Sequence, residues 1–503
     1  MSFKAALATV SSRPLDPAAL EQLAKEALRL GEEEGALPLI ERAVEQAPTA
    51  LLWQWKGLLE RSLDEHDRAL ESFAEAARLD PASISIAHGR ARVAMEAGLD
   101  AQELYRTARA LAPKNGQILI GLAAAMTSAG NGEQAIEELQ KGVAGSPMWL
   151  AGHEQLAQFV ATAGRPDEAT ASLEAALQRM PTAAPLWETL LNVQLRRGAY
   201  QTLSGIVQRA QAAGIRSNEF QIYRGIHAAE CESEAFPPAL FASAPPAIDA
   251  ALGKWRIRHL LRVGEVDAVL PLIDRELGRD QSGELWGYAS TAWRLADDPR
   301  SKWLEGDSRL VSFTDISDLL PPIETLASTL RGLHKAKGEY LDQSVRGGTQ
   351  TDGPLFCRID PVIRQLRQAI VTAVERHVAQ LPPHDPQHPT LRQPRDRRIR
   401  FSGSWSVRLR SGGHHSNHVH PQGWISSALY IALPPKDPGE PEDSGWLTLG
   451  RPDELLGIDL APWRKIEPKA GHLALFPSDM WHGTVPFKEG ERLTVAFDVA
   501  PPR

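Results

Sequence analysis

Three histidines in the C-terminal third of the chain have the type and spacing expected of a metal site. His418 and His420 are two residues apart, so in an extended strand their side chains project from the same face. His482 follows the apolar run at 473–476, far away in the sequence. Neutral imidazoles bind transition metals, and three ligands on one side of an ion leave its other positions open. His418, His420 and His482 are therefore the predicted metal ligands and catalytic residues.

Other polar side chains near these histidines have weaker claims. Asp479 precedes His482 by three residues in a predicted loop and is a rival third ligand. His414 and His415 follow two glycines, in a turn where a histidine faces solvent more often than it binds a metal. Asn417 could hydrogen-bond a ligand or a substrate, as residues around metal sites do.

A strand with one polar face begins ten residues after His482. Arg492 and Thr494 share that face, and the opposite face is apolar (Leu493, Val495, Phe497 and Val499). If the apolar face packs against a predicted helix at 361–381, Arg492 and Thr494 face the interior of the domain. A buried arginine needs an anionic partner. The alternative is an exposed arginine on an edge strand.

Taken together, these motifs resemble the double-stranded β-helix oxygenases that depend on iron(II) and 2-oxoglutarate. Within that superfamily the chain resembles bacterial members that carry tetratricopeptide repeats. The family signature is a His-x-Asp pair, a distal His, and Arg-x-Ser or Arg-x-Thr about ten residues later; His418, His482 and Arg492-x-Thr494 match it. The segments 343–351 and 423–427 also resemble this subgroup, and the resemblance covers roughly residues 307–503.

The resemblance implies Fe(II) in a facial triad, with 2-oxoglutarate as co-substrate and O2 as oxidant. It assigns the far carboxylate of 2-oxoglutarate to Arg492 and Thr494, and Tyr430 and Ser426, on one face of the strand at 425–433, are further candidates for holding the co-substrate. His420 departs from the family pattern, which usually has a carboxylate there. It is either the third ligand, with one negative charge fewer, or a supporting residue beside a water ligand; the spacing of two favours ligation.

The first half of the chain is a repeat array. Prolines recur every 32–34 residues, at 14, 48, 81, 113, 147 and 181. A glycine follows seventeen residues after five of these six prolines, whereas the second repeat has Glu65 there. A period near 34 with a turn in mid-repeat is the tetratricopeptide pattern, in which stacked helix pairs bury a continuous core.

We therefore predict an α+β multidomain protein with an all-α solenoid followed by a double-stranded β-helix (jelly-roll) domain with flanking helices. Clear repeats span 14–214 and degenerate helix pairs span 215–306, with breaks at Gly264 and at 297–299. The oxygenase domain spans 307–503, with its β-helix core at about 398–500.

Composition limits the functional classes. The net charge of -8 argues against broad nucleic-acid binding. No apolar run is long enough for a membrane span, and the N-terminus lacks a secretory signal pattern. With only Cys231 and Cys357, no disulfide framework is implied, so a reducing cytoplasm is the expected location.

A run of arginines ends a proline-rich loop before the predicted strand 399–409. The run comprises Arg392, Arg395, Arg397, Arg398 and Arg400. One interpretation is a solvated connector between elements. The other is a basic lip that attracts an acidic substrate.

Several functions fit the two-part organisation. The leading hypothesis is a hydroxylase whose peptide or protein substrate is recruited by the groove of the repeats. The alternatives are a small-molecule oxygenase whose repeats serve homodimerisation or partner docking, a non-catalytic metal-binding scaffold, and a three-histidine iron dioxygenase that does not use 2-oxoglutarate. An intact Arg492-x-Thr494 argues against the last two.

Overall fold

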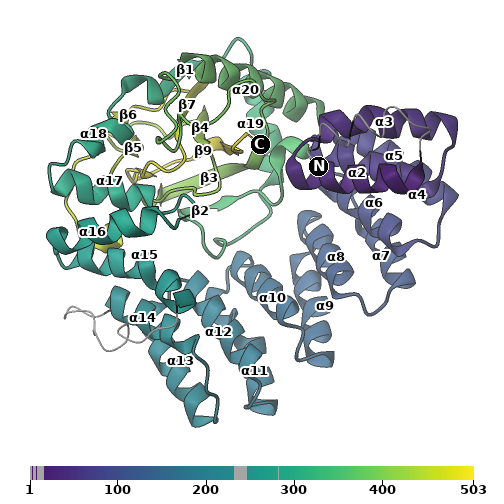
Figure 1. Cartoon of the computed structure of the whole chain (residues 1–503), viewed down its shortest axis with the longest axis horizontal. Coiled ribbons are helices and arrows are strands. Elements are labelled where there is room, and N and C mark those ends of the chain that lie inside the picture. The colour runs from purple at the N-terminus through teal and green to yellow at the C-terminus, as the bar shows by residue number, and fades with distance from the viewer. Residues whose placement is uncertain (1–2, 4–6, 8–15, 232–245, 281, 503) are drawn as a thin grey trace.

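Stacked helix pairs form the N-terminal part of the chain and curve around a C-terminal β domain (Figure 1). The computed structural model describes residues 3, 7, 16–231, 246–280 and 282–502. The first six pairs are α2 (Pro17–Leu30) with α3 (Glu33–Gln46), α4 (Ala50–Ser62) with α5 (His66–Leu79), α6 (Ile84–Glu96) with α7 (Gln102–Leu111), α8 (Gly116–Ser128) with α9 (Gly132–Gly145), α10 (Leu150–Thr162) with α11 (Ala171–Arg179), and α12 (Ala184–Arg196) with α13 (Tyr200–Ala212).

The turn inside each of these pairs requires a left-handed residue. The five predicted glycines have φ between +67° and +90°, which is accessible to glycine at little cost. In the second repeat the left-handed residue is Asp64, with φ of 60°, rather than the Glu65 that the spacing indicates. Aspartate tolerates this conformation better than most residues do. The first of the periodic prolines, Pro14, lies outside the described residues.

The helical region continues beyond the regular repeats. Its further helices are α14 (Phe220–Cys231), α15 (Pro246–Arg262), α16 (Val266–Leu277), α17 (Trp286–Leu295) and α18 (Arg300–Glu305). Gly264 and the segment 297–299, where breaks were predicted, lie in the turns of α15–α16 and α17–α18. No described helix combines the length and the apolar character needed to cross a lipid bilayer.

The C-terminal domain is a double-stranded β-helix, as predicted, built from a six-stranded and a three-stranded antiparallel sheet. The larger sheet has the order β1 (Ser312–Asp315), β7 (His472–Pro477), β4 (Ile425–Ala432), β9 (Arg492–Val499), β3 (Phe401–His415), β2 (Val345–Gln350). The smaller sheet has the order β6 (Arg464–Ile466), β5 (Leu447–Leu449), β8 (His482–Thr484).

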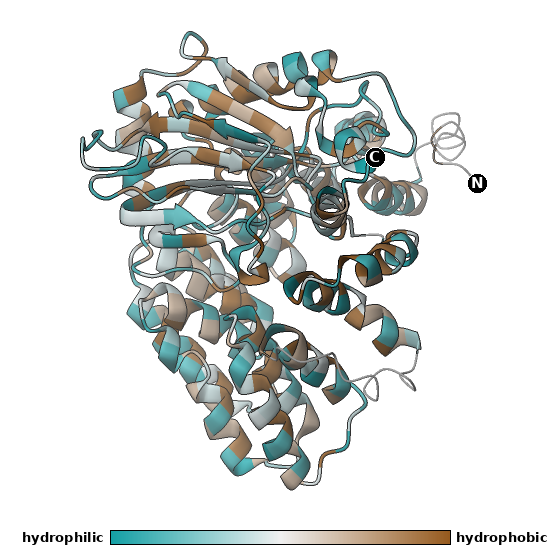
Figure 2. Ribbon diagram, turned by 90° about the vertical axis from the view of Figure 1, so that its left-hand side faces the viewer, coloured by the Kyte–Doolittle hydropathy of each residue, from teal (hydrophilic) through white to brown (hydrophobic). Residues whose placement is uncertain are grey.

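Helices α19 (Ile323–Leu333) and α20 (Pro361–Gln380) pack on the outer side of the larger sheet. One cluster of buried side chains joins these helices to the apolar face of β9, including Ile370 and Val374 of α20 with Val495 and Phe497 of β9. Polar and apolar residues alternate along the elements (Figure 2), as expected when each buries one face. The opposite face of β9 is therefore turned toward the interior between the two sheets.

The turns of the repeats dock onto the β domain. Arg400 forms ion pairs with Glu33 (2.6 Å) and Glu34 (2.7 Å) in the first turn. Arg398 meets Glu65 of the second turn at 3.2 Å, and Arg397 meets Glu32 at 3.5 Å.

Three members of the arginine run therefore join the β domain to acidic residues of the repeats, a role that neither interpretation included. The sequence could not reveal these partners because they lie more than 300 residues away.

Backbone hydrogen bonds connect later turns in the same way. The amide of Ile359 donates to the carbonyl of Ala97 (3.1 Å), and the amides of Lys337 and Gly338 donate to Thr162 (2.8 and 2.9 Å). The amide of Asp342 donates to Arg196 (3.0 Å). Opposite the fourth turn, around Ser128, a cavity of about 550 Å3 separates the two parts. The inner edge of the repeat array is thus largely engaged by the chain's own β domain.

Candidate metal centre

The three predicted histidines converge between the two sheets. His482 begins β8, and His418 pairs with it through two backbone hydrogen bonds of 2.9 and 3.0 Å. The amide of His420 donates to the carbonyl of Ser478 (2.8 Å). Residues 418–420 form only this isolated bridge, in place of the predicted strand, and Pro421 has no amide with which to extend the pairing.

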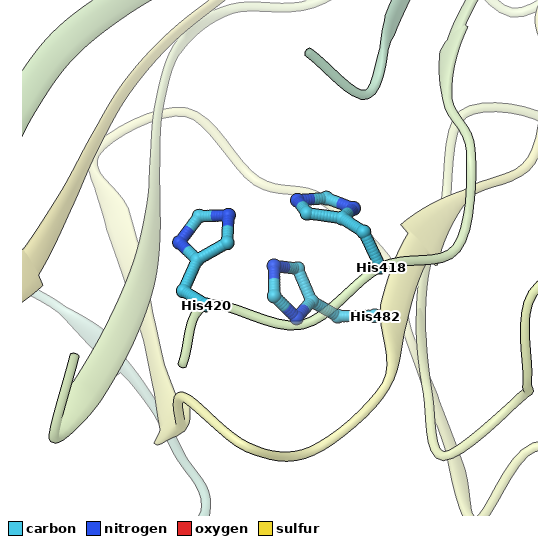
Figure 3. Close-up of side chains that lie close together, drawn as sticks. All are labelled: His418, His420 and His482. Atoms are coloured by element: carbon cyan, nitrogen blue, oxygen red, sulfur yellow. The ribbon is translucent and has the colours of Figure 1, made fainter. Parts of the chain in front are cut away.

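The imidazoles face one another closely enough to share an ion (Figure 3). One nitrogen of each lies within 4.8 Å of the others, and the ring centroids are 4.2–5.0 Å apart.

Hydrogen bonds select the same tautomer in all three rings. Nδ1 of His418 lies 2.8 Å from the carbonyl of Ser416, and Nδ1 of His482 lies 3.0 Å from that of Met480. Nδ1 of His420 lies 2.7 Å from the carboxylate of Asp498. Since each acceptor requires a proton on Nδ1, the Nε2 lone pairs are left for a metal.

Burial favours neutral rings at two of the three positions. Burial and neighbouring histidines hold the pKa of His418 and of His482 well below the ordinary value. For His420, burial alone would lower the pKa, but the carboxylate of Asp498 outweighs burial and raises the pKa above its ordinary value.

Asp498 is the principal site residue that the sequence reasoning missed. It lies on β9, is largely buried, and accepts a hydrogen bond from Ser426 (2.6 Å). Alternation along β9 offered the signal, because Asp498 has the same parity as Arg492 and Thr494 and so faces the interior with them. Its position inside an apolar strand concealed it.

Arg492 and Thr494 lie beside the histidines, and both line a small pocket of about 50 Å3 with them. Arg492 is 2% exposed. Its Nη1 donates to the carbonyl of Gly445 (3.0 Å), and its Nε is among the buried atoms that have no hydrogen-bond partner in the described residues. Burial lowers the pKa of Arg492 from its ordinary value. A buried guanidinium without a carboxylate partner is suited to an incoming anion.

The remaining predicted co-substrate residues support this pocket from behind. The Tyr430 ring lies under the guanidinium of Arg492, 5.1 Å from its Cζ, and is fully buried. Ser426 is buried beneath His420, where its hydroxyl donates to Asp498 and lies 2.9 Å from Ser478 Oγ. Ser426 therefore contacts the residue that orients His420.

The weaker candidates do not join the histidine group. Burial, together with the negative charge of the buried Glu305, raises the pKa of Asp479 to about 7. His414 is at the end of β3, and His415 stacks on His418 at a centroid distance of 6.0 Å, sharing the hydroxyl of Ser344 with it. His415 is half-buried instead of facing solvent as predicted, because β3 continues to this residue and pairs with β2.

Asn417 is hydrogen-bonded to the loop at 452–454. Its buried side-chain amide donates to the carbonyl of Pro452 (3.1 Å) and to Glu454 (2.9 Å), which fixes the 452–454 loop next to His418.

A cleft of about 1070 Å3 leads to His418 and His420. One wall belongs to the β domain and includes Arg346, Trp405 and Glu454. The helical region contributes Tyr200 of α13. The cleft therefore lies where the two parts of the chain meet.

Family models match both parts of the sequence. The family described as "Putative 2OG-Fe(II) oxygenase" matches residues 403–498. Two tetratricopeptide-repeat models match residues 3–84 and 99–151. The chain thus combines N-terminal tetratricopeptide repeats with a C-terminal domain of this oxygenase family.

Solved structures similar to the chain include tetratricopeptide proteins. MamA (residues 41 to the end) from Desulfovibrio magneticus RS-1 is 18% identical, covers 33% of this chain and 97% of its own, and has a TM-score of 0.29. TTC0263 from Thermus thermophilus is 19% identical, with coverages of 36% and 100% and a TM-score of 0.28. A tetratricopeptide repeat protein from Parabacteroides merdae ATCC 43184 is 17% identical, with coverages of 48% and 98% and a TM-score of 0.29. No match was found among curated proteins.

The residues of the oxygenase domain fit the groups that its family implies. Three imidazoles are ligands that Fe(II) accepts; Nε2 of His418, which lies 3.1 Å from the hydroxyl of Ser344, would exchange this contact for the metal. The unpartnered Nε of Arg492 fits a carboxylate in the same pocket.

Proposed function

We propose that the protein is an Fe(II)- and 2-oxoglutarate-dependent oxygenase in which His418, His420 and His482 hold the iron. The observation that carries this proposal is the convergence of three Nε2 atoms beside a buried arginine with an unpartnered Nε. Either feature alone has a structural explanation. Their presence in one pocket, on the inner faces of the two sheets, is the arrangement that a metal and a carboxylate-bearing co-substrate require.

Asp498 supports His420 as a ligand despite the missing family carboxylate. A carboxylate on Nδ1 orients an imidazole and increases its basicity toward a metal. The negative charge of Asp498, located behind His420, also compensates the positive charge of the ion. Ser426, by donating to Asp498, holds that carboxylate in position.

Arg492 has the position of a co-substrate anchor. We propose that its guanidinium binds the far carboxylate of 2-oxoglutarate, with Thr494 beside it and the ring of Tyr430 limiting the movement of the guanidinium. Bound iron and 2-oxoglutarate would supply the oxidising chemistry, in which O2, 2-oxoglutarate and a substrate C–H bond give an alcohol, succinate and CO2. The protein positions that bond and limits access of water.

A peptide or protein segment is the proposed substrate. The cleft in front of the histidines has a volume of about 1070 Å3, at the upper end of the range of about 300–1,000 Å3 typical of small-molecule pockets, and so has room for a peptide segment. Its lining comes from both parts of the chain, with Tyr200 from the helical region and Arg346 and Glu454 from the β domain. Since the inner turns of the repeats are engaged by the oxygenase domain, we propose that substrate enters this cleft and not a free groove of the solenoid.

Anaerobic titration tests the co-factor proposal. Purified metal-free protein receives Fe(II) and then 2-oxoglutarate, and the visible charge-transfer band of the chelate is recorded for wild type, His420→Ala and Arg492→Ala. We expect a band in wild type and its loss or displacement to higher 2-oxoglutarate concentration in Arg492→Ala. Iron binding without a band would exclude 2-oxoglutarate as co-substrate, and the absence of iron binding would favour a non-catalytic scaffold.

A further inference from the structure

Two residues that flank the metal-binding histidines pack against the helical region. Val419 stands between His418 and His420, and Trp481 immediately precedes His482. Both belong to a cluster whose other buried members come mainly from α15–α18, among them Tyr288 and Trp293. The segments that carry the histidines are therefore supported by the core of the helices, outside the core that α19 and α20 form with the larger sheet.

Gly287 of α17 is the point of closest approach. A Cβ placed on this glycine would lie 3.0 Å from Cγ1 of Val419 and 3.0 Å from Nε1 of Trp481. Contacts this short force the neighbouring side chains to move by a few tenths of an ångström. Because Gly287 has no side chain, there is room for Val419 and Trp481, which are the sequence neighbours of the three histidines.

Hydrogen bonds fix Trp481 in this contact. Its indole N–H donates to the carbonyl of Gly287 (2.7 Å) and lies 3.2 Å from the hydroxyl of Thr291. Tyr288 packs edge-on against the indole at a centroid distance of 5.1 Å. Such bonds specify both the depth and the direction of the ring.

A second connection reaches the backbone of the same segment. Arg294, also on α17, donates to the carbonyl of Gly450, and the amide of Gly450 donates to the carbonyl of Trp481 at 2.6 Å.

The residue before His418 is connected to α15 by a separate route. Asn417 holds the 452–454 loop, and Asp453 of that loop accepts a hydrogen bond from Arg258 at 2.9 Å. Arg258 is 5% exposed and also pairs with Glu230 of α14 (2.5 Å). The buried arginine thus links α14 and α15 to the loop beside the metal ligands.

We infer that helix α17, through Gly287, is a positioning element of the metal centre. The degenerate end of the repeat array sets the spacing of the histidines in the oxygenase domain, so the helical region contributes to metal binding without donating a ligand. This inference rests on the proposed function, because it takes His418, His420 and His482 as the ligands.

Metal affinity of Gly287→Ala tests the inference in the full chain. The probe is Co(II), whose visible absorption reports both occupancy and coordination geometry. The matched control is Gly205→Ala on α13, where an added Cβ meets no atom within 4 Å. Helix propensity favours alanine at both sites, so it cannot explain a loss at one of them. We expect affinity in Gly287→Ala to fall by about ten- to hundredfold, as for residues that orient metal ligands, with a changed Co(II) spectrum.

Two further variants keep the test decisive. Val419→Ala in the Gly287→Ala background removes one of the two close neighbours, and we expect it to restore part of the affinity and the wild-type spectrum. Trp481→Phe removes the indole donor but retains an aromatic ring, and we expect weaker Co(II) binding even if Gly287→Ala fails to fold.

The outcomes separate the inference from the proposed function. Wild-type affinity and spectrum in a folded Gly287→Ala, or in Trp481→Phe if the glycine variant does not fold, would overturn the inference. Absence of Co(II) and Fe(II) binding by wild type would instead overturn the metal centre itself.

Discussion

Both carboxylate oxygens of Asp498 lie 2.7 Å from Nδ1 of His420. The sequence lacks a carboxylate at position 420, where the family pattern usually has one, but the fold supplies one directly behind the imidazole. The pair comes from distant elements, a loop before β4 and the last residues of β9. Their relationship leads to the first prediction.

Restoring the family carboxylate alone should weaken the site. In His420→Asp, two carboxylates would face each other at close range, and like charges in a buried site repel. We expect weaker Fe(II) binding in His420→Asp than in the double variant His420→Asp/Asp498→Asn. A double-variant cycle of Fe(II) dissociation constants, including Asp498→Asn alone, measures the coupling between the two positions. Additive effects would contradict the proposed role of Asp498.

Arg492 should affect the co-substrate and not the metal. Arg492→Ala removes the buried guanidinium, and we expect 2-oxoglutarate affinity to fall by about 2 kcal/mol or more, or roughly thirtyfold. Arg492→Lys keeps the charge but not the planar pair of donors, so its affinity should be intermediate. Iron affinity measured without 2-oxoglutarate serves as the control and should stay at the wild-type value. Equal 2-oxoglutarate affinity in all three proteins would exclude this anchor.

Asp479 should make the metal-free protein less stable as pH rises. Its pKa is raised from an ordinary 3.8 to about 7 by burial and by Glu305, while Arg392 opposes the shift. Between these values the folded state holds a proton that the unfolded state has lost, so stability decreases as pH rises through 7. Asp479→Asn removes this contribution to the pH dependence of stability.

The quantity to compare is the thermal midpoint of Asp479→Asn minus that of wild type. We expect this difference to be about 2–6 °C larger at pH 8.5 than at pH 5. Scanning calorimetry at both pH values measures this difference. The same difference between the two proteins at each pH would show that the Asp479 carboxylate does not titrate in this range.

Arg400 should contribute to stability at the contact between repeats and oxygenase domain. Its partner Glu33 is 1% exposed, and among the described residues its carboxylate would keep only the hydroxyl of Ser62 (2.8 Å) in Arg400→Ala. We expect a loss of about 2 kcal/mol in the free energy of unfolding, because a buried carboxylate is left without its cation.

Arg397→Ala is the matched control for Arg400→Ala. Its pair with Glu32 is longer, 3.5 Å, and more exposed, so we expect a change of about 0.5 kcal/mol or less. Denaturant unfolding followed by circular dichroism compares the variants. Equal effects would argue against a specific role of the buried pair.

The sequence was sufficient for the parts of this fold that repeat or alternate. A period near 34 predicted the helix pairs, and alternation in β9 predicted which face carries Arg492. The spacing of His418 and His420 predicted that their rings converge, although the structure has an isolated bridge in place of a strand.

Features that depend on tertiary pairing could not be predicted in this way. Asp498 was hidden within an apolar strand, and its partner lies 78 residues away. Other contacts join segments that are about 200 to 370 residues apart. They are the ion pairs of the arginine run and the hydrogen bond between Trp481 and Gly287. Local periodicity contains no information about such pairs.

The docking of successive turns has a consequence for the length of the array. The first three turns, the fifth and the sixth each meet their own partner on the oxygenase domain, from Arg400 at one end to Asp342 at the other. Removing one helix pair would shift every later turn by one place and set it against a partner that belongs to its neighbour. In an ordinary solenoid, repeats can be gained or lost without disturbing the others. Here the oxygenase domain fixes the number of repeats, because its docking positions match successive turns of the array.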